Sequence, residues 1–306
     1  MNTLFSIGAV SVTAYALGMA LSLAACAVLV FVCFLKAGLP RIMAERFLLL
    51  ALPLGYVLAR LSYVLLRLPY FLERGDGLAF RLWQGGYTLW GALAAIILAA
   101  LIAAKMHKTS FGKTMDALAA PSLLLLALGR FCEGLAGMGF GQEAPAAVSF
   151  FPFAVGNEWG EWRWTIFMLE GVAALVFLVI VIKHKGKAGD RFLLALVLFC
   201  AFQILFESLR EDEVISFGFV RAGQLLCAIT LFALMACGLF RRGGLKGKKI
   251  VSFIAYFLLI GVIVGMEFAI DKTNWPILLI YGLVLLSCMG LALVTGRALG
   301  LGREQA

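Results

Sequence analysis

Long apolar runs alternate with short polar segments along the whole chain. Nine of these runs approach or exceed the length of about 20 residues that a helix needs to cross the hydrocarbon core of a bilayer. The pattern therefore predicts an all-α, polytopic membrane helix bundle. The expected spans are roughly residues 10–35, 47–66, 84–104, 117–136, 164–182, 192–208, 221–240, 250–269 and 276–296.

The composition agrees with this class. Hydrophobic residues make up 63% of the chain, charged residues make up 14%, and the mean hydropathy is +1.01. These values are typical of an integral membrane protein and exclude an ordinary soluble domain.

The distribution of charge predicts an orientation. The formal net charge is +9, but most of the 26 lysines and arginines lie in the first, third, fifth and seventh loops and in the C-terminal tail. Basic loops face the cytosol. We therefore expect the N-terminus outside and the C-terminus in the cytosol, and no nucleic-acid partner.

The stretch at residues 122–141 concentrates polar chemistry in an apolar helix. Arg130 and Glu133 lie three residues apart, so a helix places them on one face, where they can pair. Charges at membrane depth usually face a partner or a wet cavity. The glycines that follow either allow close helix packing or offer bare amides to an anion. They are Gly134, Gly137, Gly139 and Gly141.

Other spans carry isolated polar residues. Arg60 lies in the middle of the second span, and Glu170, in the fifth, needs a partner. On the sixth span, residues spaced by four and then three form one polar stripe. These are Gln203, Glu207 and Arg210. Guanidinium groups clustered near one end of the spans suit the phosphate of a phospholipid.

Several kinds of site are excluded by their missing motifs. The chain has no HExxH, no GxSxG and no P-loop, so we expect no metal centre and no cofactor. Both histidines, His107 and His184, fall in expected cytosolic loops. The seven cysteines form no CxxC pair and indicate apolar packing, with Cys132 beside the charged pair the one of interest. The aromatic segment 142–163 predicts an arm lying at the membrane interface.

Seven segments in one order resemble the prolipoprotein diacylglyceryl transferase family, over about residues 6–240. They read SIGAVSVTAYALG, LARLSYVL, RLWQGGYTLWG, APSLLLLALGRFCEGLAGMGFG, MLEGVAAL, AFQILFESLRED and AGQLLCAI. The resemblance implies a bacterial inner-membrane enzyme with seven core spans. It would transfer a diacylglyceryl group from phosphatidylglycerol to the cysteine thiol of a prolipoprotein lipobox peptide, releasing glycerol phosphate.

The resemblance also implies site residues. Arg130 matches the family's signature arginine, which would hold the phosphate, and further positions match the site or its support: Tyr15, Arg60, Gly141, Glu207 and Arg210. Other family positions differ in this chain. Trp90 stands in place of a histidine, Glu133 of an asparagine, Met138 of a glutamate and Gln203 of an arginine.

These differences leave several readings open. The expected phospholipid-binding residues are Arg60, Arg130, Gly141, Gln203, Arg210 and Tyr15, and the expected catalytic residues are Arg130, Glu133 and Glu207. Glu133 acts as the base or only neutralises Arg130, and Tyr15 is a site residue or an interfacial anchor. The protein is the transferase, a non-catalytic lipid- or lipoprotein-binding homologue, or a transferase for a different lipid or acceptor. We expect a transferase-like domain at residues 1–245 and an appended two-span hairpin with a cytosolic tail at residues 246–306.

Overall fold

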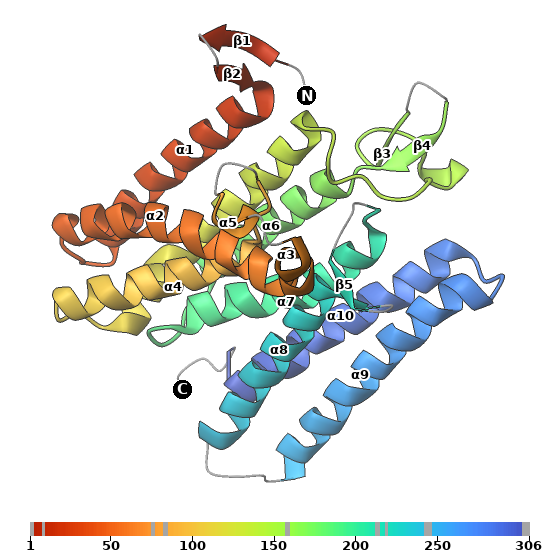
Figure 1. The fold of residues 1–306 in the computed structure, drawn as a ribbon. Helices are drawn as coiled ribbons and strands as arrows, with labels where there is room; N and C mark the ends of the chain where they lie inside the picture. The colour runs from red at the N-terminus through yellow and green to blue at the C-terminus, as the bar shows by residue number, and fades with distance from the viewer. Residues whose placement is uncertain are drawn as a thin grey trace. The chain divides into compact units, whose positions relative to one another are not determined.

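Helices dominate the structure, a computed structural model that describes residues 3–7, 10–74, 77–81, 85–156, 160–211, 215–217, 220–241 and 247–301. The helices in this part of the chain are α1 (Ala14–Lys36), α2 (Arg41–Leu66), α3 (Leu68–Arg74), α4 (Leu89–Met106), α5 (Phe111–Leu135), α6 (Ile166–Lys183), α7 (Asp190–Leu209), α8 (Ala222–Arg241), α9 (Gly247–Lys272) and α10 (Ile277–Leu299) (Figure 1). Short 3-10 turns occur at Leu78–Phe80 and Ala146–Val148. The expected all-α class is confirmed.

Three small antiparallel hairpins accompany the helices in the described part of the chain. They pair β1 (Thr3–Ile7) with β2 (Val10–Thr13), β3 (Ala154–Gly156) with β4 (Trp162–Trp164), and β5 (Ser216–Phe217) with β6 (Val220–Arg221). Among the described residues each sheet has two strands, and each hairpin lies next to the end of a helix in sequence.

Nine of the described helices are long and apolar enough to cross a membrane, as the hydropathy pattern predicts. Four of their starts differ from the expected ones by four residues or more. The second and fourth spans begin six residues earlier, at Arg41 and Phe111. The first span begins at Ala14 rather than residue 10, because Val10–Thr13 alternates β-branched and hydroxyl side chains and pairs with β1. The third begins at Leu89 rather than residue 84, where Thr88 accepts a hydrogen bond from the Gly91 amide and caps the helix.

The chain divides into two compact units. Unit 1 comprises Met1–Leu23 with Ser122–Ala306, and unit 2 comprises Ala24–Pro121. The domain boundary expected between residues 245 and 246 lies outside the described residues. The polar residues of interest fall in both units, so each unit is described by itself.

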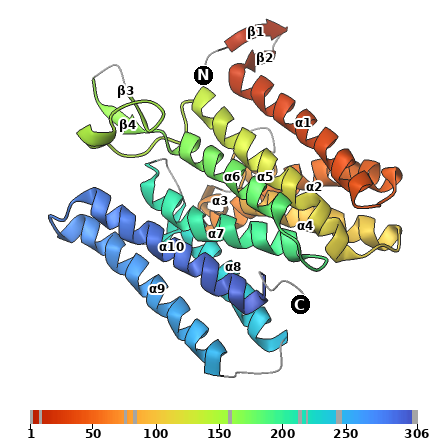
Figure 2. The same ribbon diagram turned by 180° about the vertical axis from the view of Figure 1, so that it is seen from behind.

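In unit 1, α7 is the central helix. It packs against α6, α8 and α10, while α9 lies alongside α10 (Figure 2). Its side chains are accordingly the most buried of any span among the described residues. The helix that carries the stripe Gln203, Glu207 and Arg210 is therefore enclosed by its neighbours.

The expected interfacial arm leaves α5 and returns to α6. It contains β3 and β4, and its apolar side chains remain exposed at Phe150, Phe151, Phe153 and Trp162. Trp159 lies outside the described residues. Exposed aromatic rings next to the ends of spans suit the headgroup region of a bilayer.

In unit 2, α2 and α4 form the closest helix pair, with Gly91 at their contact. A Cβ atom placed at Gly91 would lie 2.6 Å from the Cα atom of Ala59. The absent side chain lets the two backbones approach, as small residues do between membrane helices.

This contact predicts opposite effects for two glycines of unit 2. We expect Gly91→Ala to destabilise the protein by about 1–3 kcal/mol through overpacking. Gly55→Ala is the control, because Gly55 is also helical but has nothing within 4 Å of its would-be Cβ. It should be neutral or stabilise by about 0.5–1 kcal/mol. Thermal unfolding in detergent measures both, and equal midpoints would contradict the packing assignment.

Candidate functional site

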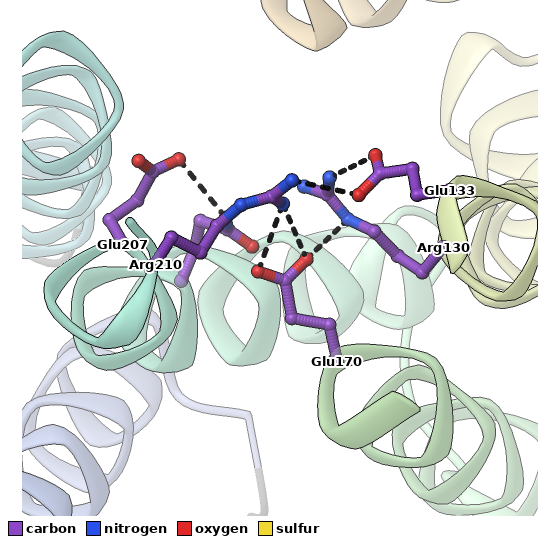
Figure 3. A network of polar contacts seen from close by, with 6 residues as sticks. Arg130, Glu133, Glu170, Glu207 and Arg210 are labelled. Atoms are coloured by element: carbon purple, nitrogen blue, oxygen red, sulfur yellow. Dashed lines mark hydrogen bonds and ion pairs between the residues drawn. The ribbon is translucent and has the colours of Figure 1, made fainter. Parts of the chain in front are cut away.

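Two arginines and two glutamates of unit 1 form a closed ring of alternating charge. Arg130 and Glu133 come from the last turns of α5, Glu170 from the first turns of α6, and Arg210 directly follows α7 (Figure 3). Each side chain is ion-paired with two of the others. Positive and negative groups therefore alternate around the whole circuit.

The distances define the ring. Arg130 Nη1 donates to Glu133 Oε1 at 2.5 Å, and Arg210 Nη2 donates to Glu133 Oε2 at 2.8 Å. On the other side, Arg210 Nη1 lies 3.3 and 3.4 Å from the two oxygens of Glu170. Arg130 Nε and Glu170 Oε2 close the circuit as an ion pair. Both oxygens of each carboxylate are thus engaged by arginine.

Burial is uneven around the ring. The side chain of Glu170 is 3% exposed and that of Arg210 is 10% exposed, whereas the Glu133 side chain is 20% exposed. Glu170 therefore lies on the buried side of the ring, and Glu133 lies on its more exposed side. A buried ion pair gains little net stability, but removing one partner leaves an uncompensated charge at a cost of about 3–5 kcal/mol.

Glycines after α5 bring the chain back over the ring. Gly139 has φ +79°, and a Cβ there would lie 3.1 Å from Glu133 Oε2 and 2.7 Å from Phe167 Cβ. Gly141 lies against the backbone of Leu209 and forms a bridge with Arg210. Its amide donates to Trp164 O at 2.8 Å. Gly141 is thus a point of close backbone approach, and its N–H already has an acceptor.

Glu207 lies beside the ring. Unlike the ring carboxylates of Glu133 and Glu170, it accepts a hydrogen bond from an amide and not from an arginine in the part of the chain that the structure describes. Its Oε1 accepts a hydrogen bond from Gln203 Nε2 at 3.2 Å. Its Oε2 is buried and has no hydrogen-bond partner among the described residues. The ring is neutral by count of charges, so Glu207 gives the group of five a formal charge of −1 if every carboxyl group is ionised.

The first helix completes this end of unit 1. A Cβ at Gly18 would lie 2.8 Å from Cys132 Sγ, so α1 packs directly on α5. Ser22 Oγ lies 3.8 Å from the same sulfur. Tyr15, one turn before Gly18, lies within electrostatic range of Glu133 and Arg130. Cys132 is buried, and its contacts are those of a packing residue.

A small cavity adjoins the ring between α5, α6 and α7. Arg130, Glu170 and Gln203 lie along its wall, but the surface that faces the cavity is apolar. The remaining lining is apolar: Leu126, Ala174, Phe177, Phe199, Phe202 and Phe206. The cavity has a volume of about 10 Å³, which is room for about one water molecule, so it does not hold a lipid chain as it stands.

Arg60 belongs to unit 2 and is described apart from the ring. It is 4% exposed, donates to the carbonyl oxygens of Gly85 and Leu78, and stacks on the rings of Tyr63 and Phe71. Its guanidinium therefore fastens the loop between α3 and α4. Trp90 begins α4 in the same unit, where an indole cannot accept a proton.

Three of the four ring residues were predicted as site residues from the sequence, and Glu170 was not. Arg130, Glu133 and Arg210 were expected in the site, whereas Glu170 was expected only to need a partner. The structure supplies that partner twice, through Arg130 and Arg210. A single acid in an otherwise apolar span was the signal. Met138 is exposed beyond the end of α5, and no cluster suited to a metal ion occurs among the described residues.

Comparisons with known proteins agree on one family. A family profile described as "Prolipoprotein diacylglyceryl transferase" matches residues 2–241. Three relatives named phosphatidylglycerol–prolipoprotein diacylglyceryl transferase come from Symbiobacterium thermophilum, Shouchella clausii and Bacillus licheniformis. The first is 29% identical over 63% of this chain and 74% of its own length. The second is 28% identical, over 71% of this chain and 81% of its own length, and the third is 26% identical, over 71% and 83%. The profile match ends before α9 and α10.

The ring predicts unequal costs for two similar substitutions. Glu170→Gln removes the buried negative charge that faces both arginines, and we expect it to destabilise the protein by about 3–5 kcal/mol. Glu207→Gln is the control, since Glu207 pairs with no arginine in the described part of the chain, and should cost less than about 1 kcal/mol. Chemical unfolding in mixed micelles measures both. The same loss for the two variants would contradict a ring closed through Glu170.

Proposed function

The chain belongs to the prolipoprotein diacylglyceryl transferase family, and we propose that it transfers a diacylglyceryl group from phosphatidylglycerol to the cysteine thiol of a prolipoprotein lipobox. The nine apolar helices of its described part, together with the family, make it a multi-pass bacterial membrane protein. The single observation that carries the proposal is the pair of buried arginines held by Glu133 and Glu170 at one end of the spans.

Arg130 is proposed to bind the phosphate of the donor lipid. Nη1 and Nε of Arg130 face glutamates, but Nη2 makes no hydrogen bond to a described residue. These remaining N–H groups suit a phosphate oxygen of the donor lipid. Arg210 supports the same charge from across the ring.

Glu207 is proposed to be the general base for the thiol. Both oxygens of Glu133 and both of Glu170 already accept from arginine, whereas Glu207 keeps one oxygen without a partner among the described residues. A base must reach the proton that it removes. This favours Glu207 over Glu133, which serves better as the counter-ion that orients Arg130 and Arg210.

The proposed reaction is a displacement at carbon. Glu207 takes the proton of the cysteine thiol, and the sulfur electron pair attacks the glycerol CH₂ that carries the phosphate ester. The new S–C bond forms as the C–O bond breaks, and its electrons leave with glycerol phosphate, which Arg130 and Arg210 stabilise. The proton passes from Glu207 to the departing product, so the enzyme is regenerated.

Other expected site residues receive supporting roles in this proposal. Gln203 fixes Glu207 through its 3.2 Å hydrogen bond, and Tyr15 borders the more open Glu133 side. Gly141 gives the backbone its close approach to Arg210. Arg60 shapes the loop that precedes α4. A role of Arg60 in holding lipid remains a prediction from the sequence.

The N-terminus is proposed to lie outside and the C-terminus in the cytosol. The basic loops support this orientation, which would put the ring near the outer leaflet. A C-terminal fusion to green fluorescent protein should fluoresce, and the same fusion to alkaline phosphatase should be inactive. The reverse pair of results would contradict the orientation.

A transfer assay tests the function directly. Purified protein in phosphatidylglycerol micelles is given a lipobox-cysteine peptide, and mass spectrometry follows the diacylglyceryl adduct. We expect Arg130→Ala to lower turnover by at least about 10²-fold and Glu207→Gln by about 10²- to 10⁴-fold. Arg163→Ala is the matched control, because Arg163 pairs with Glu211 on the exposed surface, and should stay near wild type.

Two outcomes would redirect the proposal. Turnover that survives Glu207→Gln but is lost in Glu133→Gln would make Glu133 the base. If wild type gives no adduct where a related enzyme does, the chain would instead be a lipid-binding homologue or act on another lipid or acceptor. The lipid that co-purifies with it would then be the next measurement.

A further inference from the structure

We propose that the α9–α10 hairpin contributes to catalysis, because Glu267 of α9 acts through α8 as a positioning residue for Glu207. This inference rests on the proposed function, which makes Glu207 the base. The hairpin lies beyond the segment matched by the family profile, yet it packs against the helix that carries Glu207. Three contacts connect the two glutamates.

The first contact is between Glu267 on α9 and Gln224 on α8. Gln224 Nε2 donates to Glu267 Oε1 at 2.9 Å. A carboxylate within a membrane span costs about 2.5–3.5 kcal/mol on insertion scales, so it is retained where it has a partner or a use. Gln224 is the partner observed here.

The second contact runs from Gln224 to α7. The same Nε2 also lies 3.4 Å from the carbonyl oxygen of Ile204, three residues before Glu207. The amide oxygen of Gln224 accepts from the backbone N–H of Arg221 at 3.2 Å. One side chain thus joins α7, the beginning of α8 and α9. The amide nitrogen and the amide oxygen of Gln224 are both hydrogen-bonded, so the orientation of this side chain is fixed.

The third contact is between α8 and Glu207 itself. A Cβ atom at Gly223 would lie 2.6 Å from Glu207 Cδ, so the α8 backbone lies directly against the carboxyl group. Gly223 is adjacent in sequence to Gln224. Any shift in the first turn of α8 therefore moves the wall that confines Glu207.

The hairpin also holds α8 at other points. Tyr256 of α9 donates its hydroxyl to Ala228 O at 2.7 Å, and α10 packs on both α7 and α8. The hydrogen bond of Tyr256 lies farther along α8 than Gly223, since Ala228 comes five residues later. This hydrogen bond joins α9 to α8 away from the backbone that contacts Glu207, which makes Tyr256 a useful control.

The test compares Glu267→Ala, Glu267→Gln and Tyr256→Phe in the full-length protein. Two properties are measured: the transfer kinetics, and the rate at which dicyclohexylcarbodiimide modifies Glu207, followed by peptide mass spectrometry. Glu207→Gln confirms the assignment of the labelled peptide. Tyr256→Phe removes one α9–α8 hydrogen bond, as Glu267→Ala does, but at a distance from Gly223.

We expect Glu267→Ala to lower kcat about tenfold, with KM changed less than about twofold, because a misplaced catalytic group costs turnover more than binding. Its Glu207 should also react faster with the carbodiimide, since the wall at Gly223 is loosened. Glu267→Gln keeps an acceptor for Gln224, so its kcat and its Glu207 labelling rate should both stay close to those of the wild type. Tyr256→Phe should match wild type in both.

The proposal is overturned if Glu267→Ala and Tyr256→Phe give the same kcat and the same labelling rate. If wild type shows no transfer, the proposed function fails, and the labelling rates alone still decide whether Glu267 positions Glu207. If Glu267→Ala does not fold, Gln224→Met removes the same hydrogen bond from the α8 side and carries the same expectation.

Discussion

Four charges in an apolar surrounding must neutralise one another, and this requirement organises the site of unit 1. Neither Arg130 nor Glu170 is tolerable alone at membrane depth, where an unpaired charge costs several kcal/mol. Arg130 and Glu133 pair within α5, and the other three pairs join different helices. The ring thereby fixes the end of α5, the beginning of α6 and the end of α7 relative to one another.

The ring also explains how arginines can be ready for a phosphate without a ligand. A guanidinium has five N–H donors in a rigid fork. Glu133 and Glu170 occupy the donors of Arg130 that face the ring, and the remaining Nη2 group is held in place by those contacts. A preorganised donor does not have to reorient when charge develops on a leaving group. The carboxylates are therefore part of the arginines' function as well as their neutralisation.

The sequence predicts the local part of this arrangement. Hydropathy gives the nine spans, and the three-residue spacing gives the Arg130–Glu133 pair, because both depend only on helix geometry. The pairing of Glu133 with Arg210, 77 residues apart, depends on how far each helix is rotated about its axis. That rotation is set by packing along whole helices, which no short motif encodes. The same holds for Gly223 beneath Glu207 and for Gln224 between α7 and α9.

If the ring acts as one unit, Glu133 and Arg210 are energetically coupled, and a double-mutant cycle between them tests this most directly. The unfolding free energies of Glu133→Gln, Arg210→Gln and the double variant are measured in the same micelles. We expect the double variant to lose less stability than the two single losses combined, by about 0.5–3 kcal/mol. Strictly additive losses would mean that the two side chains do not interact, and the closed ring would be wrong.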